Sequence, residues 1–409
     1  MAAREVDHLL IGGGLATASC AQALREEGAD GSILVVGREP DAPYNRPPLS
    51  KGYLRGEQDR AGALVCPQEW WAEHDVELLT GTSVMKLDPT DRLATLSTRE
   101  EVRFRQALLA TGANVRRLRA DGSELEGLHY LRAFANSDAI RADAAEAEKV
   151  VLIGGSYIGC EVAASLTAAF DCDCTLLMQE NVTLERSFGP EIGAYFRGVL
   201  TGHGVRVHGG DELAHFEGSG GRVRRVVTRG GLELDCDCVV IGAGVMPDTM
   251  LARAAGLDLG ESGGVRCSSR LETSAPGVYA AGDMCEYDSV VHGRAIRVEH
   301  WDVASEHGRT VALNMLGRDV PHETIPYFFS DLADWASMEY VGPGSGEPLV
   351  RGSLDGGAFT AFYLDGGKVT AALTVGRSED LDHARRLIRD GARPDPDALG
   401  DPGTDLATV

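Results

Sequence analysis

Apolar runs separated by a helix-like segment open the chain and predict a strand–helix–strand unit over about residues 5–37. Val6, Leu9, Leu10 and Ile11 form an extended apolar start, and a second apolar run covers Ile33 to Val36. Short apolar runs on either side of a helical segment are typical of a βαβ unit with a buried parallel sheet. The opening of the chain therefore predicts an α/β fold.

The same pattern begins again at Lys149. The segment KVVLIGGSYIGCEVAASL reads as strand, glycine turn and helix, and a further strand is expected from Cys174 to Met178. The chain therefore contains an internal repeat of two such units.

The turns in this repeat carry most of a glycine fingerprint. Gly12 and Gly14 fill two positions of G-x-G-x-x-G, with Thr17 at the third, and the second unit places Gly154, Ser156 and Gly159 there. The first glycine allows a sharp turn off the strand, and the second lets backbone N–H groups approach a pyrophosphate at the helix N-terminus. Two partial fingerprints in one chain predict two dinucleotide-binding units.

Further elements follow from the pattern in the rest of the chain. Three strands are expected to end in small residues that let a ligand approach the backbone, in ALLATGANV, CVVIGAGVMPD and GVYAAGDM. The loop over 37–56 contains Pro43, Pro47 and Pro48, which exclude a helix. The other expected elements are helices at 68–73, 189–204 and 380–390, strands at 76–80, 84–87, 101–115, 358–364 and 368–375, short strands up to about 235, and a frayed tail over 391–409.

Composition limits the classes of function. At 409 residues the chain should hold two or three domains, and its net charge of −23 argues against nucleic acid and anionic membranes as partners. We expect no signal peptide and no membrane-spanning segment. Nine cysteines are an odd number, so free thiols in a reducing, cytoplasmic location are expected.

Several motifs together resemble the ferredoxin reductase group of the pyridine nucleotide–disulfide oxidoreductase superfamily, which includes putidaredoxin and rubredoxin reductases and apoptosis-inducing factor. They occur in the family's order over about residues 6–375. The motifs are IGGGLATAS, PYNRPPLSK, LLATGA, GGSYIGCE, VVIGAGVMPD, YAAGD, RVEHW and FFSDL.

The resemblance implies an α/β fold with two Rossmann-like FAD- and NAD(P)-binding domains of the glutathione-reductase type, followed by an α+β domain. It implies an FAD domain in two parts, residues 1–117 and 247–324. The NAD domain, 118–246, is inserted between these parts, and the C-terminal domain covers 325–409.

The resemblance also assigns residues to the FAD site. Arg38 or Glu39 is expected at the adenosine ribose, Val84 at the adenine, Asp283 at the ribityl chain and Trp301 at the isoalloxazine ring. A carboxylate after a glycine-rich strand end suits ribityl hydroxyls, which agrees with the role of Asp283. The other expected FAD contacts are Gly12, Gly14, Leu15, Ala16, Arg46, Lys51, Ala110, Thr111, Gly112, Arg132 and Gly282.

Lys51 and Glu161 are the catalytic candidates that the resemblance implies. It places Lys51 near the flavin N5 atom, where a cation stabilises the charge that develops on hydride transfer, and pairs Glu161 with it. A structural interpretation of Glu161 stays open, because an acid on the first turn of a helix is favoured in any protein.

NAD contacts transfer to the second unit, with two departures from the family pattern. Ser156 replaces the middle glycine, and Met178 stands where a ribose-binding glutamate is usual, with Glu180 two residues later. NADH is favoured over NADPH because Glu180 would repel a 2′-phosphate, with Arg186 as the alternative phosphate ligand. The expected contacts are Gly154, Tyr157, Ile158, Glu180, Gly244, Glu299 and His300.

The cysteines and histidines show no spacing typical of a catalytic or metal site. Asp41 to Ser50 lacks the early cysteine of the peroxidases and coenzyme A disulfide reductases in this superfamily. Cys172-x-Cys174 and Cys236-x-Cys238 have the wrong spacing for zinc or iron–sulfur sites, so buried free thiols are expected.

Three functions remain open from the sequence. The resemblance favours an enzyme that takes hydride from NADH and passes electrons to a ferredoxin or rubredoxin that feeds an oxygenase. The alternatives are a flavoenzyme that reduces a small molecule such as a quinone, and a redox-sensing flavoprotein like apoptosis-inducing factor. A homodimer is one possible oligomeric state. The acidic chain would repel an acidic ferredoxin at long range, and Arg385, Arg386 and Arg389 are either an offsetting cluster or a solvated helix face.

Overall fold

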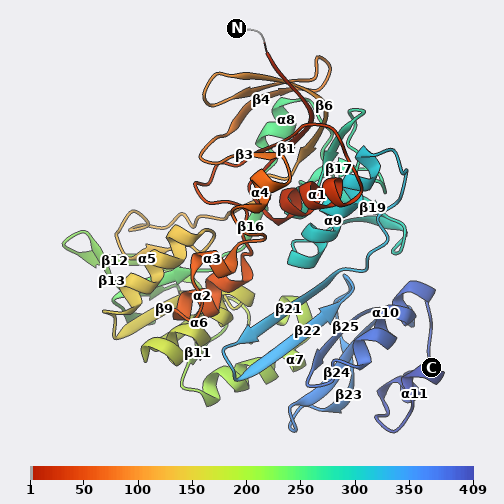
Figure 1. Ribbon diagram of the computed structural model, residues 1–409. Coiled ribbons are helices and arrows are strands. Elements are labelled where there is room, and N and C mark those ends of the chain that lie inside the picture. Colours follow the sequence, from red (N-terminus) through yellow and green to blue (C-terminus); the bar gives the residue numbers. More distant parts are fainter. Residues whose placement is uncertain (1–2) are drawn as a thin grey trace. The chain divides into compact units, whose positions relative to one another are not determined.

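The computed structural model describes residues 3–409, which form two compact units, each discontinuous in sequence (Figure 1). Unit 1 comprises the described residues up to Arg46 together with Ala61–Asn114 and Met246–Pro326. Unit 2 comprises Pro47–Arg60, Val115–Val245 and Tyr327–Val409. The predicted α/β class is confirmed, whereas the four-part domain division stays a prediction.

Unit 1 is built on a seven-stranded sheet in the order β3-β2-β1-β6-β5-β4, with β18 also paired to β6. The pairs β1–β2, β1–β6 and β2–β3 are parallel, and Leu9 of β1 lies beside Leu34 on one side and Ala107 on the other. The strands are β1 (Arg4–Ile11), β2 (Ile33–Val36), β3 (Val76–Leu79), β4 (Val84–Asp88), β5 (Leu93–Leu96), β6 (Glu101–Leu109) and β18 (Val278–Ala280).

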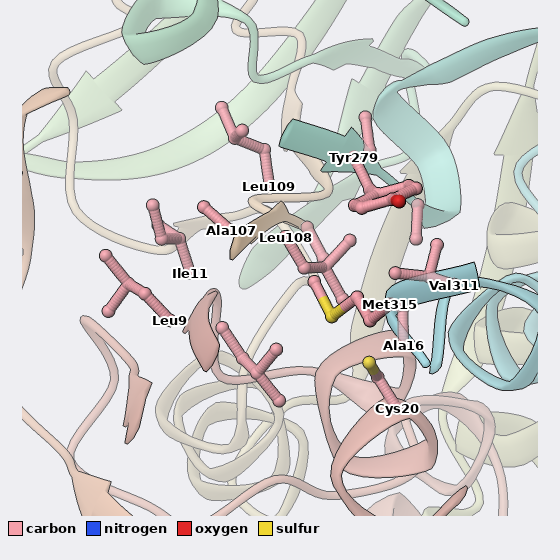
Figure 2. Close-up of a cluster of buried hydrophobic side chains, with 14 of the residues drawn as sticks. Leu9, Ile11, Ala16, Cys20, Ala107, Leu108, Leu109, Tyr279, Val311 and Met315 are labelled. Atoms are coloured by element: carbon pink, nitrogen blue, oxygen red, sulfur yellow. The ribbon is translucent and has the colours of Figure 1, made fainter. Parts of the chain in front are cut away.

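Two helices, α1 (Leu15–Glu26) and α9 (Trp301–Met315), complete the core of unit 1. Figure 2 shows side chains of β1, β6 and β18 gathered with Cys20 of α1 and with Val311 and Met315 of α9. The helices pack closely at Gly308, where a Cβ atom would lie 2.3 Å from the carbonyl oxygen of Ala16. This packing fixes the start of α1 behind the first glycine turn.

Smaller elements complete unit 1. Strands β17, β19 and β20 form a separate three-stranded sheet. The chain passes from one unit to the other after Arg46, Arg60, Asn114, Val245 and Pro326. The bounds are α3 (Arg60–Ala63), α4 (Trp70–Glu73), β7 (Ala113–Val115), β16 (Val245–Pro247), α8 (Met250–Ala254), β17 (Val265–Cys267), the 3₁₀ turn η2 (Gly282–Met284), β19 (Cys285–Ser289) and β20 (Arg294–Arg297).

Unit 2 contains the second repeat as a parallel sheet in the order β11-β10-β9-β15-β8. Val150 lies beside both Cys174 and Cys238, so β9 is central. Helix α7 contains a kink at Gly189, whose φ of 82° is not helical and which precedes Pro190. The elements are β8 (Leu128–His129), α5 (Phe134–Ala144), β9 (Lys149–Ile153), α6 (Tyr157–Phe170), β10 (Asp173–Leu177), α7 (Glu185–Gly202), β11 (Arg206–His208) and β15 (Cys238–Ile241).

Two antiparallel sheets complete unit 2. Strands β12 (Leu213–Ser219), β13 (Arg222–Thr228) and β14 (Glu233–Asp235) form one sheet. The other has the order β21-β22-β25-β24-β23 and carries α10 against β25 (Figure 1). Its elements are β21 (Tyr327–Leu332), β22 (Ala336–Val341), β23 (Pro348–Ser353), β24 (Ala358–Asp365), β25 (Lys368–Val375), α10 (Asp380–Asp390), α11 (Pro396–Gly400) and the 3₁₀ turn η3 (Leu406–Thr408).

The proline-rich loop differs from the expectation that it contains no helix. A 3₁₀ turn, η1 (Pro47–Ser50), is followed directly by the short helix α2 (Gly52–Arg55). The prolines lie before α2, so they remove no hydrogen bond from it. Both elements pack on α5 and α6 (Figure 1) and belong to unit 2.

The C-terminal tail also differs from the expectation, because residues 391–409 are ordered. Leu399 and Leu406 are buried. The buried Arg351 donates hydrogen bonds to the carbonyls of Leu399, Asp401, Pro402 and Thr404. Arg386 donates to the backbone oxygens of Leu406 and Val409, so it is not part of a free cationic cluster. Proline and glycine content suggested fraying, but two arginines satisfy the tail's carbonyls.

Replacing Arg351 with methionine should destabilise the C-terminal sheet. The change removes these donors and one cation beside the buried carboxylate of Asp380, whose oxygen lies 3.5 Å from Arg351 Nε. Loss of one partner of a buried pair costs about 3–5 kcal/mol. Urea unfolding should report this loss, and hydrogen exchange should rise over 399–409. Arg385→Met, which removes a pair to the exposed Asp382, is the control and should change stability by less than about 0.5 kcal/mol. Equal effects of the two variants would contradict the role of Arg351 in holding the C-terminal tail.

All nine cysteines are free and buried, as predicted. Burial raises the pKa of Cys66 and of Cys172 to about 11, so these thiols carry no charge at neutral pH. Within residues 3–409, none of the helices combines the length and the apolar content that a membrane span requires.

Candidate functional site

The first glycine turn, between β1 and α1, leaves room for a ligand on one side only. Gly12 has φ 136°, and a Cβ atom there would lie 2.2 Å from the carbonyl oxygen of Ala110. At Gly14 an added Cβ would meet no atom within 4 Å. Gly12 is therefore required by the protein's own backbone, whereas the space beside Gly14 is open.

The N-terminus of α1 presents backbone N–H groups to that space. Among the described residues, no side chain caps the N-terminus of α1 at Gly14, and the first turn carries no acidic residue. Leu15 and Ala16 are the first residues of the helix, and Thr17 directs its hydroxyl back to the Gly14 carbonyl at 2.7 Å. An uncapped helix start with positive partial charge fits a pyrophosphate, so these residues fit FAD.

Side chains after β2 form a charged cluster in the same unit. Arg46 Nη2 lies 2.6 Å from Glu39 Oε1, and the Tyr44 hydroxyl donates to the other oxygen of Glu39. Burial lowers the pKa of Arg46, but Tyr44, Glu39 and Asp283 outweigh this effect and raise it above its ordinary value. Arg46 is thus a cation fixed by Glu39 and Tyr44.

Arg38 and the end of β6 form a second group in unit 1. Arg38 Nη1 lies 3.0 Å from Asp248 Oδ2, and its Nη2 donates to Asn114. Thr111 donates its hydroxyl to the Asp248 carbonyl at 2.6 Å, and Gly112, with φ 71°, accepts from the Asp248 N–H. Glu39 faces Arg46 while Arg38 faces Asp248, so the two ribose candidates belong to different local groups.

The turn η2 holds Asp283 at the end of β18. Gly282 has φ 71°, and its N–H donates to Nδ1 of the buried His307. Arg297 Nη1 donates to the Asp283 carbonyl at 2.8 Å and forms an ion pair with Glu299 at 2.5 Å. The backbone of Asp283 is therefore fixed from two sides.

The start of α9 carries two further candidates of unit 1, His300 and Trp301. Trp301 is 41% exposed, and its Nε1 donates to Asn45 Oδ1 at 2.7 Å. Burial lowers the pKa of His300 to about 4, so its imidazole is neutral at physiological pH. Val84, expected at the adenine, is the first residue of β4 and is half-buried.

The second glycine turn, in unit 2, repeats the first. Gly154 has φ 106°, and a Cβ there would lie 2.4 Å from the Gly242 carbonyl oxygen. Gly159 brings α6 close to the turn, since its Cβ would lie 2.0 Å from the Gly154 carbonyl oxygen. Ser156 directs its hydroxyl to the Gly242 carbonyl at 3.4 Å, and at Gly244 an added Cβ would meet open space.

The start of α6 also fits a dinucleotide, because among the described residues the first turn has neither a side-chain cap nor an acid. Ile158 is 38% exposed at this end. Tyr157 instead packs between Phe188 and Phe328, and burial raises its pKa to about 12.

Lys51 and Glu161 form an ion pair inside unit 2. Lys51 Nζ lies 2.7 Å from Glu161 Oε1, and both side chains are buried. The Ser330 hydroxyl donates to the same oxygen, and the Ser50 hydroxyl donates to Oε2, each at 2.5 Å. The Glu161 carboxylate is thus satisfied by one cation and two hydroxyls from two segments, Ser50–Lys51 and Ser330. The Phe329 ring centroid lies 5.6 Å from the ammonium nitrogen.

The segment that carries Lys51 is itself anchored by serines. Ser137 of α5 donates to the Leu49 carbonyl at 2.8 Å, and Ser165 of α6 donates to the Ser50 carbonyl at 2.7 Å. These two hydroxyls bind the carbonyls of the last two residues of η1. They therefore anchor the backbone directly before Lys51.

The interpretation of Glu161 as a helix-start acid is wrong. Helix α6 begins at Tyr157, so Glu161 lies in the second turn, where the helix dipole no longer favours an acid. The glycine positions alone do not mark the start of the helix, which follows the N-cap residue Ser156.

Sequence reasoning did not identify Ser50, Ser330, Asn45 and Arg297 as partners of the candidate residues. Ser50, Asn45 and Ser330 lie in the motifs PYNRPPLSK and FFSDL. Nothing in their spacing indicates that both serines donate to the Glu161 carboxylate, or that Asn45 accepts from the Trp301 indole. Arg132, expected at the flavin or its phosphates, is half-buried just before α5 in unit 2. The roles of all these residues toward cofactors stay predictions.

Comparison with known proteins matches nearly the whole chain. Residues 6–308 match a family described as pyridine nucleotide-disulphide oxidoreductase, and residues 327–409 match one described as reductase C-terminal. The ferredoxin reductase subunit of 5,5′-dehydrodivanillate O-demethylase from Sphingobium sp. (strain NBRC 103272 / SYK-6) is 33% identical, with 98% of this chain and 97% of that protein covered.

Two solved structures are similar over the same length. The ferredoxin reductase for the CYP199A2 system from Rhodopseudomonas palustris has a TM-score of 0.93 at 31% identity, with 98% of this chain and 99% of that chain covered. The covalent complex of putidaredoxin reductase with putidaredoxin gives a TM-score of 0.92 at 31% identity, with 98% and 97% covered.

Proposed function

The chain belongs to the pyridine nucleotide-disulphide oxidoreductase family, and on this basis we propose that it is an FAD-dependent NADH oxidoreductase of the ferredoxin reductase type. The observation that carries this proposal is the end-to-end similarity to reductases that serve ferredoxins, including one solved with putidaredoxin. Its acceptor is a ferredoxin- or rubredoxin-type carrier that feeds an oxygenase.

The residues of unit 1 support FAD as the bound cofactor. The Gly12–Gly14 turn and the uncapped start of α1 receive the pyrophosphate, and Asp283, which raises the pKa of Arg46, accepts hydrogen bonds from the ribityl chain. When bound, FAD supplies the conversion of a two-electron hydride donor into single electrons. Trp301, fixed by Asn45, is proposed at the isoalloxazine ring.

The residues of unit 2 support NADH as the electron donor. The Gly154 turn and the start of α6 receive the nicotinamide dinucleotide, with Ile158 and Gly244 beside the open space. Lys51 is the proposed cation that stabilises the negative charge developing on the flavin. The support for this role is that Glu161, whose oxygens accept from the Ser50 and Ser330 hydroxyls, pairs with the ammonium and orients it.

We propose a cytoplasmic location, supported by the nine free thiols, and four domains at 1–117, 118–246, 247–324 and 325–409. Neither nucleic acid nor membrane is a proposed partner, because the net charge of −23 repels both.

The same charge makes docking of an acidic carrier dependent on short-range contacts, so moderate salt should increase rather than reduce turnover with a ferredoxin.

Rapid mixing tests the proposed function. The FAD-loaded protein should be reduced by NADH in stopped-flow absorbance, and turnover should be supported by a [2Fe–2S] ferredoxin or a rubredoxin. Fast turnover with quinones and none with any iron carrier would favour the small-molecule alternative. Slow reduction with a long-lived charge-transfer band and no turnover would favour a redox sensor.

A further inference from the structure

Three polar side chains meet inside unit 1 around atoms that the protein itself does not satisfy. Tyr287 of β19, His307 of α9 and His322, which follows α9, are all buried. Their rings pack edge to face, with centroids between 4.5 and 5.2 Å apart. Within residues 3–409, the Tyr287 hydroxyl and the two histidine Nε2 atoms have no hydrogen-bond partner. Buried polar groups are nearly always hydrogen-bonded, so this cluster indicates a binding site for a small polar molecule.

The hydrogen bond at the other ring nitrogen of His307 determines where this histidine carries its proton. Its Nδ1 accepts from the Gly282 N–H at 3.2 Å, because a backbone amide can only donate. Burial lowers the pKa of His307 well below its ordinary value and that of His322 to about 4, so both rings are neutral at physiological pH. A neutral ring carries one N–H, which in His307 is on Nε2. The unsatisfied atom of His307 is therefore a donor.

His322 has the opposite tautomer. The Thr310 hydroxyl donates to the Glu306 carbonyl at 2.9 Å, which uses its only proton. Nδ1 of His322 lies 3.0 Å from the same hydroxyl oxygen and therefore donates to it. Since the proton of His322 is on Nδ1, its Nε2 is an acceptor. The cluster thus combines one donor, one acceptor and a tyrosine hydroxyl, which can act as either.

We propose that Tyr287, His307 and His322 bind one water molecule, and that this water positions the turn η2 through His307. The water accepts from Nε2–H of His307, donates to Nε2 of His322 and shares a third hydrogen bond with the Tyr287 hydroxyl. Three hydrogen bonds to otherwise unsatisfied groups are typical of a buried water. A metal ion does not fit, because the protonated Nε2 of His307 offers it no lone pair.

The water holds one edge of the His307 ring, and the opposite edge holds the turn. Nδ1 of His307 accepts from Gly282, whose φ of 71° directs the chain into η2. The next residue is Asp283, the proposed partner of the ribityl chain. His307 is thus a positioning residue for Asp283. This part of the inference rests on the proposed function, because it takes FAD as the ligand of Asp283.

The sign of a stability change tests for the water. In the FAD-loaded protein, Tyr287→Phe should lower the melting temperature by about 2–4 °C, because the hydroxyl loses a hydrogen bond. A hydroxyl without a partner would be a buried unsatisfied group, and its removal would leave the melting temperature unchanged or raise it. Either of those results overturns the proposal. Tyr363→Phe is the matched control, since Tyr363 is also fully buried and its hydroxyl donates to the Phe188 carbonyl at 3.1 Å. The two variants should shift in the same direction.

Spectroscopy and amide exchange test the positioning of the turn. Nitrogen-15 NMR of the histidine rings should show the proton on Nε2 of His307 and on Nδ1 of His322, and the reverse pattern would contradict the site. His307→Leu should speed exchange of the Gly282 amide and weaken FAD binding, each by about tenfold, the effect of one lost hydrogen bond. His307→Gln should restore both, because its amide oxygen accepts from Gly282 while its amide nitrogen donates to the water. Equal behaviour of the two variants would show that His307 does not position the turn.

The outcomes separate this inference from the proposed function. If the melting, NMR and exchange results are as expected but NADH does not reduce the flavin, the proposed function fails and the water site stands. If NADH reduces the flavin but Tyr287→Phe melts at or above the original temperature, the water site fails and the proposed function stands.

Discussion

Replacing Lys51 with methionine is expected to slow reduction of the flavin by NADH by about 100-fold, the effect of losing one preorganised charge that acts on the transition state. The flavin's reduction potential should fall as well, because the reduced form loses a stabilising cation. FAD should stay bound, since the Gly12–Gly14 turn and Asp283 are unchanged. Stopped-flow kinetics and potentiometric titration measure the two effects. Lys86→Met, the same change at an exposed position of β4, should leave both at their original values.

A double-mutant cycle tests whether Glu161 acts through Lys51. Glu161→Gln should be milder than Lys51→Met, because the amide oxygen can still accept from the ammonium. The double variant should lose less than the sum of the single losses, with a coupling of roughly 0.5–3 kcal/mol in activation free energy. Strict additivity, or a Lys51 variant that is reduced at the original rate, would leave this ion pair a structural element only.

Replacing Gly12 with alanine should abolish FAD binding and reduce the yield of folded protein. The new methyl group would lie 2.2 Å from the carbonyl oxygen of Ala110, and φ of 136° is a conformation that alanine rarely adopts. The carbonyl belongs to the end of the central β1–β6 pair, so it cannot move away without breaking the sheet. Flavin absorbance and circular dichroism of the purified protein measure the two losses.

Gly14→Ala distinguishes space needed by the protein from space needed by the ligand. Its Cβ would meet no protein atom within 4 Å and its φ is −115°, so the apoprotein should fold and melt normally. FAD should nevertheless bind more weakly, because the methyl group enters the space assigned to the pyrophosphate. Unchanged FAD affinity in Gly14→Ala would place the pyrophosphate elsewhere.

The sequence was sufficient to predict the elements that depend on local pattern. Both strand–turn–helix units, the strands at 358–364 and 368–375 and the helix at 380–390 were predicted within a few residues. Apolar periodicity and glycine positions determine such elements, because burial and φ are local requirements. The ion pair of Lys51 with Glu161 was predicted only through the family resemblance.

Local sequence patterns do not predict contacts between segments that are distant in the sequence. Ser330 shares the Glu161 carboxylate from 169 positions away, and no periodicity marks a serine for that role. Proline and glycine content predicts a frayed tail, but the tail is ordered because the buried Arg351, which no apolar pattern marks, satisfies its carbonyls. The same holds for η1 and α2, whose association with unit 2 depends on Ser137 and Ser165.

The contacts of Glu161 come from two segments distant in sequence, Ser50–Lys51 and Ser330, and this has a consequence for protein engineering. Exchange of residues 327–409 with a homologous reductase is an obvious route to chimeras with a new carrier preference. Such an exchange also replaces the Ser330 hydroxyl, which donates to the same oxygen as Lys51. A graft that lacks a hydroxyl at this position would change the surroundings of Lys51 together with the carrier preference. Chimeras should therefore keep Ser330 if the two properties are to be varied separately.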